Sequence, residues 1–463
     1  MSAARLAAKA CAVKPLKVSP ALGGALAFLG LDRALPLLHG AQGCTAFAIV
    51  LAVRHFREAI PLQTTAMSEI NTILGGADNL ELAIGTILQR ADPAVIGICS
   101  TALTETRDDD IAGDLKLMRQ RHPEWGDLAL VYARTPDFRG SLEQGWAAAV
   151  EATIAALVPP GIGRKRSRQV NLLAGSHLTP GDVEALKETI TAFGLTPIVL
   201  PDLSGSLDGH VADAHVPTTL GGTPVDAIRR MGHSVLTLAI GEHMRGAAAL
   251  LEDRCSVPFR VYDRLTGLAA FDGFVAELIA ISGAKAPERL QRQRSRLVDA
   301  MLDGHGTLGN RRFALAGEAD MLVAISRFVG ELGARVAVAV APCATPALAN
   351  VAAERVLVGD LDDLEQAIAE AGTDGIELIV ANSHAAEIAQ FFDIPLMRAG
   401  FPIFDRLGAG HQVSVGYEGS RELLFSLANT FIARGHAPAA TAGPGATLPP
   451  FVGETDHAPA SSC

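Results

Sequence analysis

One cysteine of this sequence lies where a thiol could bind metal. Cys44 follows Gly43 in the segment HGAQGCTAF at residues 39–47, directly after the apolar residues 36–38. We interpret the apolar run as a buried parallel strand, whose carboxyl end opens on a crevice, and Gly43 as a residue that permits a tight turn. A thiol there would face the crevice, where the thiolate form that iron–sulfur clusters require would be favoured. The alternative from the residues alone is that Cys44 is a small buried apolar side chain.

The remaining cysteines show no metal-binding spacing. They are scattered through the 463 residues without any C-x-x-C pair, and we assign no role to Cys11, Cys99, Cys255, Cys343 or Cys463. This low density is unlike that of a secreted disulfide scaffold, so we expect reduced thiols. Reduced thiols fit the cytoplasmic location that we expect because the first residues do not resemble a secretory signal.

Charge and hydropathy exclude two classes of partner. A formal net charge of −11 argues against nucleic acid, because phosphate-backbone binding needs a basic face. The longest uncharged stretch, residues 336–353, contains Pro342, Pro346 and Asn350, which suit a strand, a turn and a helix start rather than a membrane span. The first residues also lack the apolar core of a secretory signal.

The elements that must position Cys44 alternate between strand and helix. Residues 169–175 read as a strand, 183–193 as a helix and 196–200 as the next strand, with Thr179 as a good N-cap and Pro180 suited to the first helical turn. This pattern predicts a βαβ unit, and a similar alternation occurs in the last third of the chain. We therefore predict an α/β fold with three Rossmann-like domains, each a parallel sheet flanked by helices.

Composition suggests where these domains begin and end. Residues 1–160 form the predicted N-terminal α/β domain with the cluster loop, and 165–285 form a second α/β domain. Residues 286–435 form a third domain with a C-terminal helix. The tail 436–463 is rich in Ala, Pro, Gly and Ser, and we expect it to be disordered.

Several ordered segments together resemble a known family. They are HGAQGCTAF at 39–47, VRHFREAIPLQTTAMSE at 53–69, STALTET at 100–106, LSGSLDG at 203–209, NSHA at 382–385, RAGFP at 398–402 and GYEGS at 416–420. This set is similar to the nitrogenase component 1 superfamily, and most similar to its members that assemble the iron–molybdenum cofactor. The resemblance extends to about residue 434 and is more specific than any single short motif.

The resemblance implies a scaffold for cofactor assembly rather than a stand-alone enzyme. It implies an α2β2 heterotetramer with a NifE-like chain, which would hold most of the contacts to the iron–molybdenum cofactor precursor. A [4Fe–4S] cluster would be shared between the two chains, with Cys44 as the one ligand from this chain. A reductase, the Fe protein, would dock transiently, and apo-nitrogenase would accept the product.

A cysteine comparison separates this hypothesis from an electron-transferring reductase subunit. The nitrogenase β chain supplies three cysteines to its larger P-cluster, and the resemblance places Leu62 and Ala102 at the second and third of those positions. Neither side chain can ligate iron. The reductase subunit, of nitrogenase β or protochlorophyllide reductase type, stays an alternative, as does a cluster-free protein that binds a small metabolite.

Overall fold

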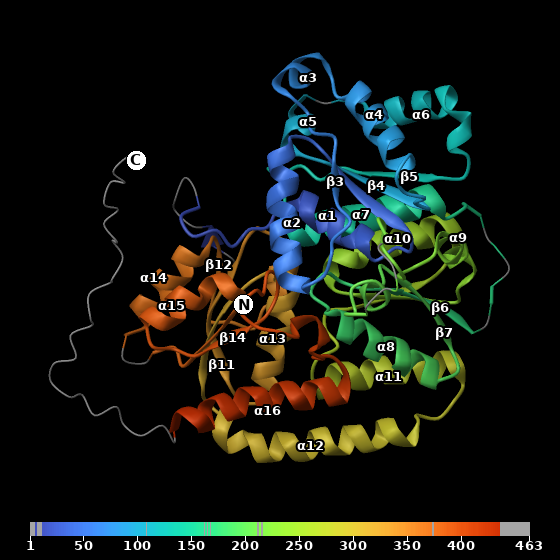
Figure 1. Ribbon diagram of the computed structural model, residues 1–463. Helices are drawn as coiled ribbons and strands as arrows, with labels where there is room; N and C mark the ends of the chain where they lie inside the picture. The colour runs from blue at the N-terminus through green and yellow to red at the C-terminus, as the bar shows by residue number, and fades with distance from the viewer. Residues whose placement is uncertain are drawn as a thin grey trace, which may run out of the picture.

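The strands of the chain form three parallel sheets (Figure 1). The computed structural model describes residues 5–6, 12–107, 109–161, 163, 165–166, 168–210, 213, 216–372 and 375–435. The first sheet has the order β3-β2-β4-β5, with β2 (Ala34–His39), β3 (Gln63–Thr64), β4 (Val95–Ser100) and β5 (Ala129–Ala133). The second has the order β7-β6-β8-β9, with β6 (Gln169–Leu173), β7 (Thr196–Leu200), β8 (Thr237–Ile240) and β9 (Phe259–Tyr262).

The third sheet is the largest. Its order is β1-β12-β11-β10-β13-β14, with β1 (Arg5–Leu6), β10 (Arg312–Ala316), β11 (Arg335–Ala341), β12 (Arg355–Val358), β13 (Leu378–Ala381) and β14 (Leu396–Arg398). Every strand pair in the three sheets is parallel. The predicted α/β class with three Rossmann-like sheets is confirmed.

Helices connect and cover these strands. Those between the strands of the first sheet, or leading into it, are α1 (Pro20–Leu29), α2 (Gln42–Phe56), α3 (Glu69–Leu74), α4 (Ala77–Leu88), α5 (Ala102–Arg107) and α6 (Ile111–Arg121). The next are α7 (Leu142–Leu157), α8 (Pro180–Ala192), α9 (Val225–Arg229), α10 (Arg245–Cys255) and α11 (Leu268–Ser282). The last are α12 (Glu288–Leu308), α13 (Ala319–Glu331), α14 (Leu361–Ala371), α15 (Ala386–Phe391) and α16 (Gly416–Gly435).

Helix α8 begins where its sequence predicts. The Thr179 hydroxyl accepts a hydrogen bond from the Asp182 N–H at 2.9 Å, and the Asp182 carboxylate accepts one from the Thr179 N–H at 3.1 Å. Pro180 occupies the first helical turn, where its missing N–H costs nothing. The reciprocal cap satisfies two N–H groups that the helix itself leaves unpaired.

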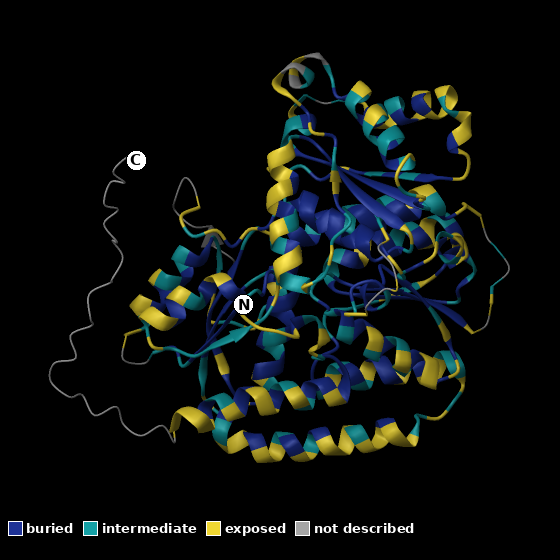
Figure 2. Cartoon of the chain, viewed as in Figure 1, coloured by how far each residue is buried: buried dark blue, intermediate teal, exposed yellow. Residues whose placement is uncertain are grey.

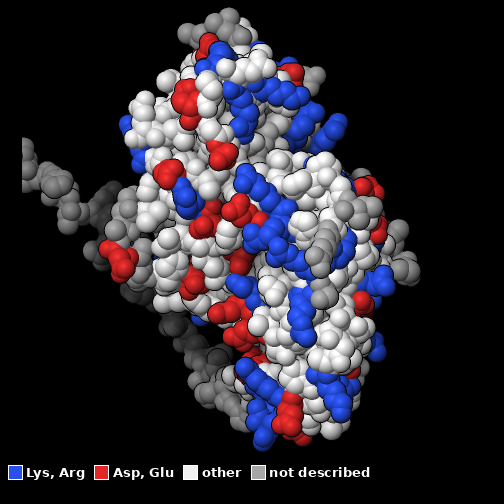
Figure 3. Space-filling view, turned by 90° about the vertical axis from the view of Figure 1, so that its right-hand side faces the viewer, with Lys and Arg blue, Asp and Glu red and all other residues white. Residues whose placement is uncertain are grey.

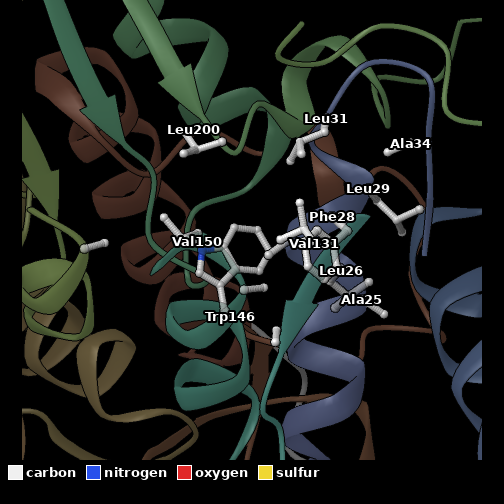
Figure 4. Packing of buried hydrophobic residues seen from close by; sticks show 14 of the residues in the cluster. Ala25, Leu26, Phe28, Leu29, Leu31, Ala34, Val131, Trp146, Val150 and Leu200 are labelled. Atoms are coloured by element: carbon white, nitrogen blue, oxygen red, sulfur yellow. The ribbon is translucent and has the colours of Figure 1, made fainter. Parts of the chain in front are cut away.

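The central core lies where α1 meets α7. All of α1 is buried, and its side chains pack with Trp146 and Val150 of α7 (Figures 2 and 4). The two helices approach closely because glycines face the partner backbone. A Cβ on Gly145 would lie 1.8 Å from the carbonyl oxygen of Pro20, and one on Gly23 would lie 2.1 Å from that of Leu142.

The two ends of the described chain fasten the third sheet. Strand β1 pairs with β12, so it extends the third sheet although our predicted boundary assigns residues 1–160 to the first domain. Helix α16 packs along α12 at the lower edge of the molecule in Figure 1. The predicted disordered tail 436–463 lies outside the described residues. No helix in the described part of the chain is long and apolar enough to cross a membrane.

Candidate functional site at the start of helix α2

Cys44 lies in the first turn of α2, directly after strand β2. Its side chain is exposed, and its N–H donates to the carbonyl oxygen of Ala41 at 3.2 Å. The tight turn predicted at Gly43 is wrong, because Gly43 is itself a helical residue. A Cβ on Gly43 would meet no atom within 4 Å, so the surface beside the thiol is open.

The acidity of this thiol also differs from expectation. Partial burial and the nearby Asp137 carboxylate raise the pKa of Cys44, so the structure does not favour the thiolate. Asp137 is held beside the helix start by the Ala102 N–H at 3.2 Å and by the Ser19 hydroxyl. A metal at Cys44 would therefore have to displace the thiol proton.

The surface of α2 beyond Cys44 is apolar and uncovered. Phe47 is 77% exposed, Val50 52% and Val53 37%. We call these three side chains the α2 face, and much of α2 is exposed in Figure 2. By contrast, the face shown in Figure 3 carries interspersed basic and acidic side chains. Exposed large apolar residues that lie together mark surfaces that associate with another molecule.

The two positions matched to P-cluster cysteines carry no ligand. Leu62 is 5% exposed and packs into the core, and Ala102 begins α5. Cys99, the nearest candidate to substitute, is fully buried on β4, and burial raises the pKa of its thiol far above the usual range. Of the cysteines within the described residues, Cys44 alone is exposed.

Ser141 has a structural role at the start of α7. Its N–H donates to the Gln144 side-chain oxygen at 2.8 Å, and its hydroxyl donates to Glu318 Oε2 at 2.5 Å. The half-buried Cys343 thiol lies 3.3 Å from the same hydroxyl. These contacts fix the junction of α7 and α13, and Ser141 is a helix cap.

The charged end of α2 makes contacts within the chain. The Arg54 guanidinium lies 4.0 Å from the centre of the Phe404 ring, and His55 Nδ1 accepts the Ile403 N–H at 2.9 Å. Arg57 donates to the Phe404 carbonyl oxygen at 2.6 Å. These three side chains hold the segment around residue 403.

The structure brings together a second group of residues that the sequence pattern does not reveal. His177, His243 and Asp320 each follow a different strand, and their potential ligand atoms lie within 4.8 Å of one another. No short spacing motif joins them. One pattern in the sequence could have indicated the two histidines. In both Gly175-Ser-His177 and Gly241-Glu-His243, a predicted strand is followed by a glycine and, two residues later, a histidine.

Comparison with known proteins identifies the family. The model of the nitrogenase component 1 type oxidoreductases matches residues 19–432. The chain belongs to the nitrogenase component 1 family. Its three parallel sheets agree with a solved family structure, nitrogenase Cp1 at pH 6.5, with a TM-score of 0.88 and 29% identity over 94% of this chain and 97% of that one.

Relatives within the nitrogenase component 1 family are similar over nearly their full length. The nitrogenase iron-molybdenum cofactor biosynthesis protein NifN of Bradyrhizobium diazoefficiens is 50% identical, over 92% of this chain and 90% of that protein. The NifN protein of a Nostoc species is 49% identical, over 93% of this chain and 96% of that protein. The resemblance inferred from the motifs is thus confirmed.

Proposed function

We propose that this chain is a scaffold subunit for assembly of the nitrogenase iron–molybdenum cofactor. It pairs with a NifE-like chain in an α2β2 heterotetramer, and Cys44 donates one thiolate to a [4Fe–4S] cluster shared across the interface. The assembly role is supported by relatives 49% and 50% identical that carry the name of cofactor biosynthesis proteins. The partner holds most contacts to the cofactor precursor.

The observation that carries this proposal is the position of Cys44 beside the α2 face. An exposed thiol next to exposed Phe47 and Val50 is the arrangement expected where a cluster is buried by a second chain. A [4Fe–4S] cluster takes about four protein ligands. With Cys44 as the only exposed cysteine of the described residues, about three ligands must come from the partner.

The residues at two other positions disfavour a P-cluster. Leu62 and Ala102 leave this chain without the second and third thiolates, so the interface holds a four-iron cluster. Such a cluster relays electrons from the docked reductase, the Fe protein, and the matured cofactor passes to apo-nitrogenase. The protein contributes position, a low dielectric and exclusion of water, while the redox chemistry belongs to the clusters.

The test is anaerobic co-purification with the NifE-like chain, followed by iron analysis and electron paramagnetic resonance. We expect about four interface irons per half-complex. Cys44→Ala should lose them while the circular dichroism spectrum is retained, whereas Cys343→Ala, which removes a half-buried thiol elsewhere, should keep them.

Each alternative function gives a different result. About eight interface irons per half-complex would favour an electron-transferring reductase subunit. A colourless complex would favour a cluster-free metabolite-binding protein. Full iron and an unchanged paramagnetic signal in Cys44→Ala would overturn the assignment of Cys44.

A further inference from the structure

Three strand ends from two sheets converge on one buried point. His177 follows β6, His243 follows β8, and Asp320 lies in the first turn of α13 after β10. The potential ligand atoms of these residues lie within 4.8 Å of one another. Ligands commonly bind at the carboxyl ends of strands in open parallel sheets.

The hydrogen bonds at this point fix His243 and orient Asp320. His243 Nδ1 donates to Asp320 Oδ2, and His243 Nε2 accepts the Ser176 N–H at 3.1 Å. The Asp320 N–H donates to Glu143 Oε1 at 2.8 Å. The side chains of His243 and Asp320 are only 4% and 1% exposed. Both ring nitrogens of His243 are therefore occupied, and Asp320 is left with one oxygen to offer.

Buried polar atoms without partners surround the same point. Asp320 Oδ1, His177 Nδ1 and Ser176 Oγ are all buried, and none has a hydrogen-bond partner among the described residues. A buried polar atom without a partner is costly, because it has lost its hydrogen bonds to water. Two of the three, a carboxylate oxygen and an imidazole nitrogen, are the donor types that bind divalent transition metals.

The backbone is shaped to admit these side chains. Gly241 has φ +98°, and a Cβ there would lie 2.7 Å from Asp320 Oδ2 and 2.9 Å from His243 Nδ1. A Cβ on Gly175 would lie 2.9 Å from His177 Nδ1. A larger residue at Gly241 would push the ring or the carboxylate out of the cluster, whereas one at Gly175 would first meet the Ile240 carbonyl oxygen at 2.3 Å.

The cluster borders a space through which an ion could enter. Ser176 and His177 line a cavity of about 540 Å³, together with Trp146, Met321 and Arg398 among others. A plausible metal site needs such an entry path as well as free donor atoms.

We propose that this cluster binds one divalent transition-metal cation. His177 Nδ1 and Asp320 Oδ1 are the direct ligands, and His243 is a positioning residue that orients the Asp320 carboxylate. Water from the cavity completes the coordination. An imidazole ligand favours Zn²⁺, Fe²⁺, Co²⁺ or Ni²⁺ over Mg²⁺ and Ca²⁺. The site is separate from Cys44 and does not depend on the proposed function.

The experiment is titration of the purified full-length chain with Co²⁺, monitored by visible absorption. We expect one ion per chain with d–d bands and without the thiolate charge-transfer band that binding at Cys44 or Cys343 would give. His177→Gln should abolish this signal. His384→Gln, at an exposed histidine outside the cluster, should leave the signal unchanged. Circular dichroism checks that each variant is folded.

The positioning role of His243 has its own readout. His243→Gln should weaken Co²⁺ binding by about 10- to 100-fold while d–d bands persist at saturation, because the direct ligands remain. A measurement on the unaltered chain guards against variants that do not fold: Cu²⁺ bound to it should show coupling to an imidazole nitrogen in pulsed paramagnetic resonance. Absence of that coupling, or equal Co²⁺ binding by His177→Gln, would overturn the proposal.

Discussion

The thiol of Cys44 combines an open position with a raised pKa. Exposure at the start of α2 lets a ligand approach, while partial burial and Asp137 keep the thiol protonated. If Cys44 binds iron as proposed, loading must release the thiol proton, and the affinity of Cys44 for iron should fall as the pH decreases. In the proposed function the bound metal, rather than the surrounding protein, would lower the pKa of the Cys44 thiol.

A neighbouring buried imidazole makes folding pH-dependent. His39 ends β2, is 1% exposed, and its Nδ1 lies 3.1 Å from the Thr65 hydroxyl. Burial lowers the pKa of His39 from 6.5 to about 4. The folded state thus binds a proton less readily than the unfolded state, so the stability from this residue is complete above pH 6.5 and is lost as the pH falls towards 4.

We therefore predict that replacing His39 flattens the pH dependence of stability. Between pH 7 and pH 5 the unaltered chain should lose about 2 kcal/mol of unfolding free energy through His39 alone. His39→Gln should lack that part of the loss. Urea denaturation at both pH values measures it, and an equal loss in the two proteins would contradict the prediction.

At the scale of elements, a helix or strand can be predicted from sequence when its local sequence signals agree with its packing in the fold. Helix α8 was predicted because Thr179 and Pro180 mark its start. Helix α1 was missed because it is buried on all sides, so it lacks an amphipathic period, and its Gly23-Gly24 pair resembles a loop. The two-residue strand β1 exists only through its pairing with β12.

The candidate sites follow the same logic. Cys44 could be singled out because a whole ordered set of motifs surrounds it, although its helical setting could not. His177 and Asp320 could not be joined from sequence, because they lie far apart in the chain and only the folding of two sheets brings them together. Local spacing carries no information on such contacts.

Close packing of α1 against α7 gives a prediction at this scale. Gly145→Ala places a methyl group against the Pro20 carbonyl oxygen, so it should lower the unfolding free energy by about 1–3 kcal/mol or more. Gly306→Ala, on the exposed side of α12 with open space around it, is the matched control. It should raise stability by about 0.5–1 kcal/mol. Urea denaturation compares the two, and similar effects would show that the helix contact is not tight.

At the scale of the whole molecule, long-range contacts join the three sheets into one body. The Asp182 carboxylate at the start of α8 accepts the Ser414 N–H at 2.6 Å and the Val415 N–H at 3.1 Å, which fixes the segment before α16. His55 of α2 and Arg57, directly after it, hold the segment around residue 403. Helix α2 is thereby supported along its charged end, and its apolar face is left turned outwards.

The exposed α2 face leads to a prediction about the proposed complex with the NifE-like chain. Phe47 is 77% exposed, so Phe47→Asp should change the stability of the isolated chain by less than about 0.5 kcal/mol. If the α2 face is buried by the NifE-like chain, an aspartate there places an unpaired charge in an apolar interface, and the complex should weaken by about 30-fold, or about 2 kcal/mol. Leu302→Asp is the control, since Leu302 is 74% exposed on α12, away from α2. Sedimentation of the co-expressed chains over a range of concentrations measures both, and equal dissociation of the two variants would show that the partner binds elsewhere.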